Sequence, residues 1–395
     1  MKTKYKVLSA VFFLLFISAI RISYLPTGNQ KSPHQTKQNG YYDYQGVIHF
    51  NTNYSDDANG TFEEIAEVAD QQKVDFMIST DHDTLKPLED KKEGWHKNTL
   101  FLAGEEIRVT DGHILTFGIQ HLSITPHERT EDVISDIVNQ GGLAIIAHTN
   151  HPSSNWKWQG ENDYGITGAE ILDLADQVAI APVFSKIKAM IFYPFNPSAA
   201  FMELYTKPAE TLKWWDKRTR NKNMVGIYAP DFHQAVRITR QYKYPFPRAD
   251  KILPIAHDHV IMQKPFSGNF SEDKKTLYDA IKRGHLYVSM DILGNASGFL
   301  FSAKQGNKTF WMGDQLQAGH PTSFSVTLPP TADSKQPLIH LYRDGEEIIQ
   351  SHDGKLNYQT DNAGIYRVEV EVATSTFLGF SKKVVWIYSN PIYLR

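Results

Sequence analysis

Short apolar runs that end abruptly in polar residues recur along the first three quarters of the chain. They have the length and the β-branched or bulky content of strands, and they lie at residues 46–50, 74–78, 100–103, 143–147 and 224–228. Helical patterns of apolar residues separate several of them, as at residues 61–72, 130–140 and 271–283. Strands that alternate with helices predict an α/β domain with a mostly parallel sheet.

Cap and turn residues mark where these elements begin and end. Thr61 and Glu64 form a capping box, and Thr130 is placed to cap the next long helix. Asp111-Gly112 lies between two strand-like runs and predicts a β-hairpin. Residues 155–200 are rich in aromatic side chains but have no regular period, so no helix or strand is predicted there with defined ends.

Helical periodicity disappears after about residue 297. Short strand-like runs separated by turn residues follow, and they predict an immunoglobulin-like β-sandwich in the last part of the chain. We therefore expect two folded units, a site-bearing α/β domain at residues 41–297 and a β-sandwich at residues 298–395.

The amino terminus has the pattern of an export segment. Three lysines among the first six residues precede an apolar run at residues 7–20. This run is shorter than the roughly 20 residues that a spanning helix needs, which favours a signal peptide over a permanent anchor. We expect residues 1–22 to be a signal peptide or an uncleaved anchor and residues 23–40 to be a linker, so that the protein is exported to the periplasm or cell envelope.

Composition limits the metal ligands and the binding partners that the chain can have. The 395-residue chain has no cysteine, so it has neither disulfides nor thiolate metal ligands, but it has 16 histidines. Its formal net charge is −3 with both signs interspersed, which gives no basic footprint for nucleic acid. A membrane partner is indicated only through the amino-terminal segment.

Metal-ligating side chains collect where the expected strands end. They are His49, Asn51, Asp56, Asp81, His82, Glu106, His113, His148, Asp231 and His233. Parallel strands bring their carboxyl ends to one edge of a sheet, so we expect these groups to converge. Mixed nitrogen and oxygen donors suit two or three divalent ions of zinc, manganese or iron. Such ions activate water, so hydrolysis is the expected reaction. Other histidines, including His257 and His259, are expected to be ordinary hydrogen-bonded residues, with His151 as the first exception to consider.

Five of these motifs occur in an order that resembles a known family. His49-Phe-Asn51, Thr80-Asp81-His82, Gly104-Glu105-Glu106, Ala147-His148 and Asp231-Phe-His233 look like the motifs of the PHP (polymerase and histidinol phosphatase) metal-dependent phosphoesterases. The Gly112-His113 pair and the segment Ser389-Asn390-Pro391-Ile392 look most like the carbaryl-hydrolase-type branch. The resemblance implies a distorted seven-stranded β/α barrel of the PHP type with a centre of two or three metal ions.

The resemblance also implies roles for individual residues. Glu106 would be the bridging carboxylate, and Asp81 would support a ligand or handle a proton. At Asn51 the family has a histidine, so this position would be a weak ligand at best. The implied metal ligands are His49, Asp56, His82, Glu106, His113, His148, Asp231 and His233.

The sequence therefore predicts an exported metal-dependent phosphoesterase that acts on a small-molecule ester. Arg108, Arg237 and Arg240 lie near the motifs and are candidates to hold the phosphate. Two alternatives stay open: a carbamate or carboxylic ester hydrolase on the same centre, and a metal- or glycan-binding protein without catalytic activity.

Overall fold

The computed structural model describes residues 40–121, 128–239, 242–334, 336–375 and 381–395. The expected export segment, nearly all of the expected linker, and Arg240 lie outside these residues, and the side chain of Arg237 is not described. None of the helices in the described ranges is both long enough and apolar enough to span a bilayer.

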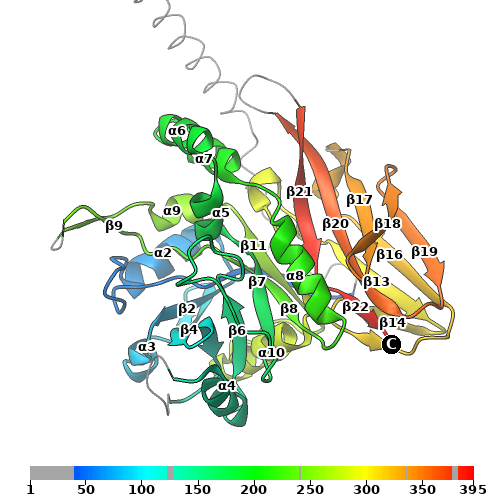
Figure 1. Ribbon diagram of the computed structural model, residues 1–395, viewed down its shortest axis with the longest axis horizontal. Coiled ribbons are helices and arrows are strands. Elements are labelled where there is room, and N and C mark those ends of the chain that lie inside the picture. The colour runs from blue at the N-terminus through cyan, green and yellow to red at the C-terminus, as the bar shows by residue number, and fades with distance from the viewer. Residues whose placement is uncertain (1–39, 122–127, 240–241, 335, 376–380) are drawn as a thin grey trace, which may run out of the picture.

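One large mixed sheet runs through the molecule (Figure 1). In the described part it has sixteen strands, most of them in the order β15-β22-β20-β21-β12-β11-β1-β2-β4-β5-β6-β7-β8. The strands that carry the site are β1 (Tyr42–Ile48), β2 (Phe76–His82), β4 (Thr99–Val109), β5 (Gly112–Phe117), β6 (Leu143–Ala147), β7 (Gly168–Asp173) and β8 (Val225–Ala229). Beside them lie β3 (Gly94–His96), β11 (His257–Met262) and β12 (Leu286–Ser289).

Helices and short connections link these strands. The helices are α2 (Phe62–Gln72), α3 (Lys86–Glu89), α4 (Thr130–Asn139), α5 (Leu174–Ile180), α6 (Val183–Phe192), α7 (Pro197–Leu204), α8 (Ala209–Thr219), α9 (Ala249–Ile252) and α10 (Phe270–Arg283). A small ribbon of β9 (Val236–Arg237) and β10 (Lys243–Tyr244) precedes α9. The α/β class is confirmed, but the expectation of a mostly parallel sheet is wrong, because β1 with β11, β4 with β5 and β5 with β6 are among several antiparallel pairs.

The cap predictions have mixed outcomes. Thr61 and Glu64 make the expected capping box on α2, and Gly284 ends α10 in a left-handed conformation with φ 77°. The prediction that Thr130 caps α4 is wrong, because Thr130 is already helical and its hydroxyl instead accepts a hydrogen bond from the backbone N–H of Asp111 at 3.1 Å. The hairpin predicted at Asp111-Gly112 is confirmed by the antiparallel pairing of β4 and β5.

The two sides of the site-bearing sheet approach each other at one point. Phe50, just beyond β1, forms an isolated parallel bridge with Phe232, which follows β8. The backbone N–H of Asn51 donates to the carbonyl of Phe232 at 3.0 Å, and that of Asp231 donates to the carbonyl of His49 at 3.1 Å. No closed ring of strands forms in the described ranges, so the seven-stranded barrel is not confirmed.

The strands expected after residue 298 are present, but they divide between two sheets. A four-stranded sheet contains β13 (Leu300–Gln305), β14 (Lys308–Trp311), β16 (Thr322–Thr327) and β19 (Leu356–Thr360). The large sheet contains β15 (Gln315–Leu316), β17 (Leu338–Arg343), β18 (Glu346–Ser351), β20 (Gly364–Ser375), β21 (Ser381–Ser389) and β22 (Ile392–Leu394), because β21 pairs with β12. Phe324 stacks on Tyr366 across the two sheets, with ring centroids 4.4 Å apart. A sandwich that forms a separate unit stays a prediction.

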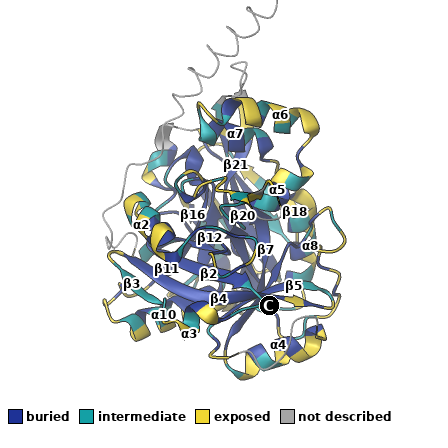
Figure 2. Cartoon of the chain, turned by 90° about the vertical axis from the view of Figure 1, so that its left-hand side faces the viewer, coloured by how far each residue is buried: buried dark blue, intermediate teal, exposed yellow. Residues whose placement is uncertain are grey.

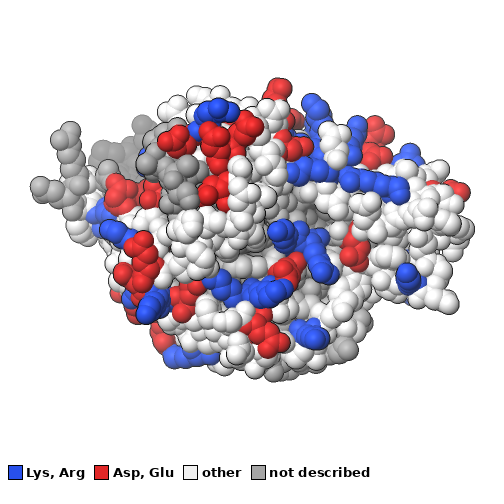
Figure 3. All heavy atoms as spheres, turned by 90° about the horizontal axis from the view of Figure 1, so that it is seen from below, with Lys and Arg blue, Asp and Glu red and all other residues white. Residues whose placement is uncertain are grey.

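Burial follows the apolar pattern of the sequence. The strands are mostly buried, whereas the outer faces of the helices are exposed (Figure 2). All five residues of β6 are buried, and Val133, Ile134 and Ile137 of α4 face the same interior. On the face shown in Figure 3, lysine and arginine lie among aspartate and glutamate.

Buried polar side chains join the two halves of the chain. The Asn390 side chain accepts a hydrogen bond from the N–H of Gly226 at 2.8 Å and donates to the carbonyls of Gly226 and Leu286 at 2.8 and 3.1 Å. Arg367 on β20 forms a bidentate ion pair with Asp216 on α8, with both N···O distances at or below 2.7 Å. Since these groups are buried, each bond is shielded from competing water.

We expect Asn390→Ala to destabilise the fold by about 2–4 kcal/mol, because it removes the side-chain partners of the buried N–H and carbonyl of Gly226 and one of the hydrogen bonds to the carbonyl of Leu286. Asn307→Ala, in the exposed turn between β13 and β14, is the matched control and should change stability by less than about 0.5 kcal/mol. Chemical denaturation of the three proteins measures both values. Equal stabilities of the two variants would contradict the assignment of Asn390 as a link between the halves.

Candidate metal centre

The strand register brings the expected ligands to one edge of the sheet. In the parallel pair of β2 and β4, His82 lies opposite Glu106. Strand β5 runs antiparallel, so its first residues return to the same edge, where His113 pairs with Ala147, the residue before His148. The bridge between Phe50 and Phe232 places His49 and Asp231 beside each other. Convergence is therefore a consequence of strand direction and pairing.

Glu106 is the centre of the cluster. It is fully buried, and each of its carboxylate oxygens faces two imidazole nitrogens. The Oε2 atom lies 3.1 Å from both His49 Nε2 and His82 Nδ1. The Oε1 atom lies 2.6 Å from His113 Nδ1 and 3.2 Å from His148 Nε2. A carboxylate between two pairs of imidazoles has the arrangement expected of a ligand that bridges two ions.

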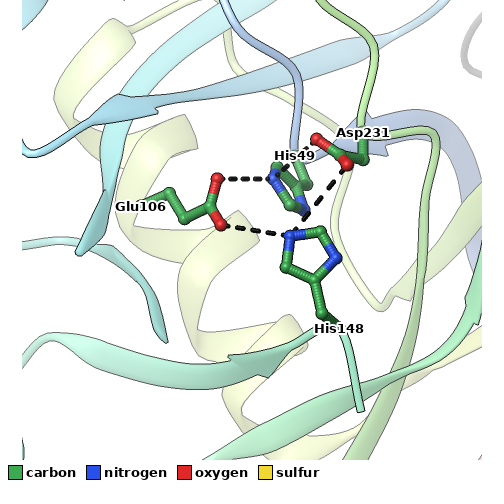
Figure 4. Close-up of side chains that lie close together, drawn as sticks. All are labelled: His49, Glu106, His148 and Asp231. Carbon is green, nitrogen blue, oxygen red and sulfur yellow. Dashed lines mark hydrogen bonds and ion pairs between the residues drawn. The ribbon is translucent and has the colours of Figure 1, made fainter. Parts of the chain in front are cut away.

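Asp231 completes a compact group with His49, Glu106 and His148 (Figure 4). Its Oδ1 atom lies 3.3 Å from His49 Nε2, and its Oδ2 atom lies 4.0 Å from His148 Nε2. Although it is buried, Asp231 Oδ1 accepts no hydrogen bond. A buried carboxylate oxygen without a donor is costly unless a cation is bound nearby, so this set of donors fits a divalent ion.

A second group lies nearer the surface and consists of Asp57, His82 and His233. The Nε2 atoms of the two histidines face each other at 3.2 Å, and Asp57 Oδ2 lies 3.4 Å from His82 Nε2 and 3.6 Å from His233 Nε2. The structure thus places Asp57 beside these histidines, whereas the sequence analysis selected Asp56, which is exposed. The turns at residues 53–57 decide which of the two neighbouring aspartates faces inward.

Three residues of the centre have strained backbones. His49, His148 and Asp231 have φ values of 71°, 51° and 42°, in the left-handed region that side-chain-bearing residues rarely adopt. Each follows the end of a strand, where this conformation turns the side chain toward Glu106. Strain of this kind persists where surrounding contacts enforce it, and it is common at functional sites.

Carboxylates that the sequence analysis missed lie behind two of the histidines. Glu170 Oε1 is 2.5 Å from His49 Nδ1, and Asp173 Oδ2 is 3.1 Å from His148 Nδ1. Both acids lie on β7, with Asp176 close behind at 3.6 Å from His148 Nδ1. A carboxylate on the far nitrogen fixes the orientation of an imidazole and makes it a better ligand. The acid that ends β7 is the signal that could have revealed Asp173.

Mutual attraction shifts the pKa values of the buried groups. Burial raises the pKa of Glu106, but the imidazoles of His49, His113 and His148 lower it by more, so it lies well below its usual range. Burial lowers the pKa of His82, and its contacts with Asp57 and Glu106 raise it to about 10. Carboxylates and imidazoles therefore stabilise each other's charged forms in the interior.

Asp81 organises the loop that follows β1. It is buried, and it accepts hydrogen bonds from the N–H and hydroxyl of Thr52 and from the N–H of Ser55. The Ser55 hydroxyl oxygen in turn accepts a hydrogen bond from the N–H of His82 at 2.9 Å. Asp81 thus lies outside the ring of imidazoles around Glu106 and is connected to His82 through Ser55. Its role in supporting a ligand or handling a proton stays a prediction.

Asn51 is poorly placed to act as a ligand. Its amide oxygen accepts a hydrogen bond from the Ser55 hydroxyl at 2.9 Å, and its buried amide nitrogen has no hydrogen-bond partner. The amide oxygen is the only side-chain atom of Asn51 that could bind a cation. Asn51 therefore offers less to the centre than the histidine of the resembled family would.

Of the three arginines proposed to hold phosphate, the structure describes one side chain. Arg108 is about half exposed and forms an ion pair with Asp83, in which its Nε atom lies 2.7 Å from Asp83 Oδ2. Asp83 therefore already neutralises the guanidinium that the sequence analysis assigned to substrate. Arg237 and Arg240 stay predictions.

A separate group of potential ligands consists of His257, His259 and Asp291. Asp291 Oδ2 lies 2.8 Å from His257 Nδ1 and 3.0 Å from His259 Nε2, and Asp43 Oδ1 lies 2.9 Å from His259 Nδ1. Both ring nitrogens of His259 are thus engaged by carboxylates. Burial lowers the pKa of His259, and these carboxylates raise it to about 10, so an imidazolium ion accounts for the charge balance of this network.

No family model and no curated protein matches the chain. Among solved structures, a two-domain protein from Bacteroides vulgatus that contains a predicted PHP-like metal-dependent phosphoesterase is 13% identical over 91% of this chain and 100% of its own, with a TM-score of 0.41. An amidohydrolase from Chromobacterium violaceum with bound sulfate and no metal is 15% identical over 48% of this chain and 87% of its own, with a TM-score of 0.29. At these TM-scores the matches carry no argument about activity, which rests on the side chains.

We expect Asp57→Asn to lose about one bound ion per chain, because it removes a carboxylate from the group with His82 and His233. Asp56→Asn is the matched control, since it makes the same change one position earlier on an exposed side chain, and it should retain the wild-type metal content. Mass spectrometry of protein loaded with Zn²⁺ or Mn²⁺ and then desalted measures the stoichiometry. Loss of metal from the Asp56 variant alone would show that the original sequence assignment is right.

Proposed function

We propose that the protein is a metal-dependent hydrolase that cleaves phosphoric esters. One observation carries the proposal: imidazoles from four different segments converge on the fully buried carboxylate of Glu106. The orphaned oxygen of Asp231 and the facing nitrogens of His82 and His233 support two or more divalent ions of zinc, manganese or iron at this place.

Each group has a role that follows from its position. His49, Glu106, His148 and Asp231 would hold the inner ion, and Asp57, His82 and His233 would hold an ion nearer the surface, with Glu106 and His113 between them. Glu170 and Asp173 orient His49 and His148. Ions bound there would lower the pKa of a water molecule and polarise a phosphoryl oxygen.

Exposure indicates the side from which substrate enters. The side chains of His82 and His233 are 20% and 21% exposed, whereas those of His49 and Glu106 are 0% exposed. The ester group would therefore approach over Asp57, His82 and His233. Hydrolysis would break one P–O ester bond, pass the phosphoryl group to water, and release the alcohol with a proton from that water.

Finer assignments belong to the same proposal. The Gly112-His113 pair and Asn390 with its neighbours support the carbaryl-hydrolase-type branch of PHP enzymes, with a barrel-like site domain and a carboxy-terminal sandwich. The lysine-rich start and apolar run at residues 7–20 support export to the periplasm or cell envelope. A carbamate or carboxylic ester is the second substrate class, favoured by the apolar surroundings of Asp231 and His233.

We expect the protein to hydrolyse p-nitrophenyl phosphate or bis-p-nitrophenyl phosphate when loaded with Mn²⁺ or Zn²⁺, and to lose at least about a hundredfold in kcat/KM after chelation, since activated water is the nucleophile. His82→Ala should lose both metal and activity, because this imidazole contacts both groups of donors. Release of p-nitrophenolate reports turnover.

The same assay separates the alternatives. Faster turnover of p-nitrophenyl acetate than of either phosphate would favour the carboxylic ester hydrolase. A metal content well below one ion per chain together with no turnover of any ester would exclude the enzyme and leave a binding protein. His340→Ala is the control, because His340 contacts Glu347 on a distant strand pair and should leave turnover unchanged.

A further inference from the structure

A cavity of about 630 Å³ opens directly beside the candidate metal centre. Asp57, Asp231 and His233 form part of its wall, so the cavity and the centre share residues. Its volume lies within the ~300–1,000 Å³ that small-molecule sites occupy. Whatever fills the cavity is therefore in reach of the group that reacts.

Away from these three residues the wall is almost entirely apolar. Helices α5, α6 and α7 contribute Leu174, Ala189 and Phe201, and the segment after β8 contributes Phe246 and Ile252. Lys186 is the remaining charged residue of the lining, and its ammonium group donates to the carbonyl of Ala179 at 3.0 Å. The chemistry of the cavity thus changes from ionic at the centre to hydrocarbon-like farther out.

Exposed apolar side chains are concentrated in the part of the chain that supplies most of the cavity wall. Of the fifteen large apolar side chains that are exposed in the described part of the chain, thirteen lie between residues 178 and 246. Val183, Phe184 and Met190 of α6 are 73%, 71% and 75% exposed, and α6 lies at the top of the molecule in Figures 1 and 2. Exposed apolar patches of this kind mark sites that bind a membrane, another protein or an apolar ligand.

We propose that the cavity binds the hydrocarbon chain of a phosphoester lipid that is drawn from a membrane surface, with the phosphate at the metal centre. This inference rests on the proposed function and specifies its substrate class. The polar wall fits the ester group, and the apolar wall fits the chain. Helix α6 has no acidic residue, and of its two lysines Lys188 is paired with Glu203 on α7, so contact with a membrane surface would be made by the exposed apolar side chains of α6 together with Lys186.

The first test is the dependence of activity on chain length. The ethyl, octyl and dodecyl p-nitrophenyl phosphate diesters are compared as dispersed monomers, and kcat/KM should rise by about fourfold for each methylene group that enters the cavity. Equal kcat/KM for the ethyl and octyl esters would overturn the proposal.

Two variants locate the effect. Met190→Asp adds a charge to the cavity wall at a side chain that is 75% exposed, so the protein should fold and the octyl-to-ethyl ratio should fall at least about tenfold. Val138→Asp makes the same kind of change on α4, outside the cavity, and should keep the wild-type ratio. An unchanged ratio in the Met190 variant would place the chain elsewhere.

A third variant tests the source of the lipid. Phe184→Ser should slow hydrolysis of the dodecyl diester embedded in vesicles of phosphatidylcholine and phosphatidylglycerol, and it should affect the dispersed octyl diester less. Equal effects on both would overturn the membrane source. A wild-type dimer that dissociates in the Phe184 variant, with no gain from chain length, would instead identify the patch as an interface between copies.

Failure of the proposed function gives a different pattern. Dodecyl phosphonate cannot be hydrolysed at its P–C bond, so the difference in calorimetric affinity between the dodecyl and ethyl phosphonates reports on chain binding in the cavity without turnover. Tight binding of dodecyl but not ethyl phosphonate, in the absence of any turnover, would support the cavity and exclude the hydrolase. No preference for the dodecyl compound would overturn the inference even if the ethyl diester is hydrolysed.

Discussion

The fold of the site-bearing half depends on how the charge of Glu106 is kept in the interior. A fully buried carboxylate costs several kcal/mol unless opposite charge and hydrogen-bond donors surround it. Here the partners are four imidazoles, and they come from four separate segments of the chain, so the charge cannot be compensated until the sheet has formed. The imidazoles that make burial of Glu106 possible are therefore the same groups that form the candidate metal site.

The backbone brings the groups of the centre together by three devices. Parallel strands place His82 and Glu106 opposite each other, and the antiparallel turn-back of β5 returns His113 to the same edge. Left-handed conformations at His49, His148 and Asp231 turn the side chains inward where the strands end. The bridge between Phe50 and Phe232 joins the segment that follows β1 to the segment that follows β8. The strain at these three residues lies just beyond the strand ends, and β7 is itself irregular, with a register shift against β8 between Glu170 and Leu172.

The sequence predicted those parts that a local pattern encodes. Histidines that directly follow apolar runs could be found, because a strand end is visible as a change from apolar to polar residues. Glu170 could not, since it lies inside the buried strand β7, and the choice between Asp56 and Asp57 depends on the conformation of a loop. Six of the strands after residue 298 were found, whereas β15, β18, β19 and β22 were not. The division between two sheets was not predicted either, because pairing partners such as β12 and β21 lie far apart in sequence.

The ionic centre and the apolar cavity lie side by side, because they share Asp57, Asp231 and His233. An apolar wall lowers the local dielectric, so that charges at the edge of the centre act more strongly on a bound ester than they would in water. It also lets the unreactive part of a substrate contribute binding energy that holds the ester in place. Low dielectric therefore has two effects: it makes the buried charge of Glu106 costly when that charge is unpaired, and it strengthens the electrostatic action of the centre on a bound ester. The carboxylates behind His49 and His148 keep these imidazoles in position when substrate binds.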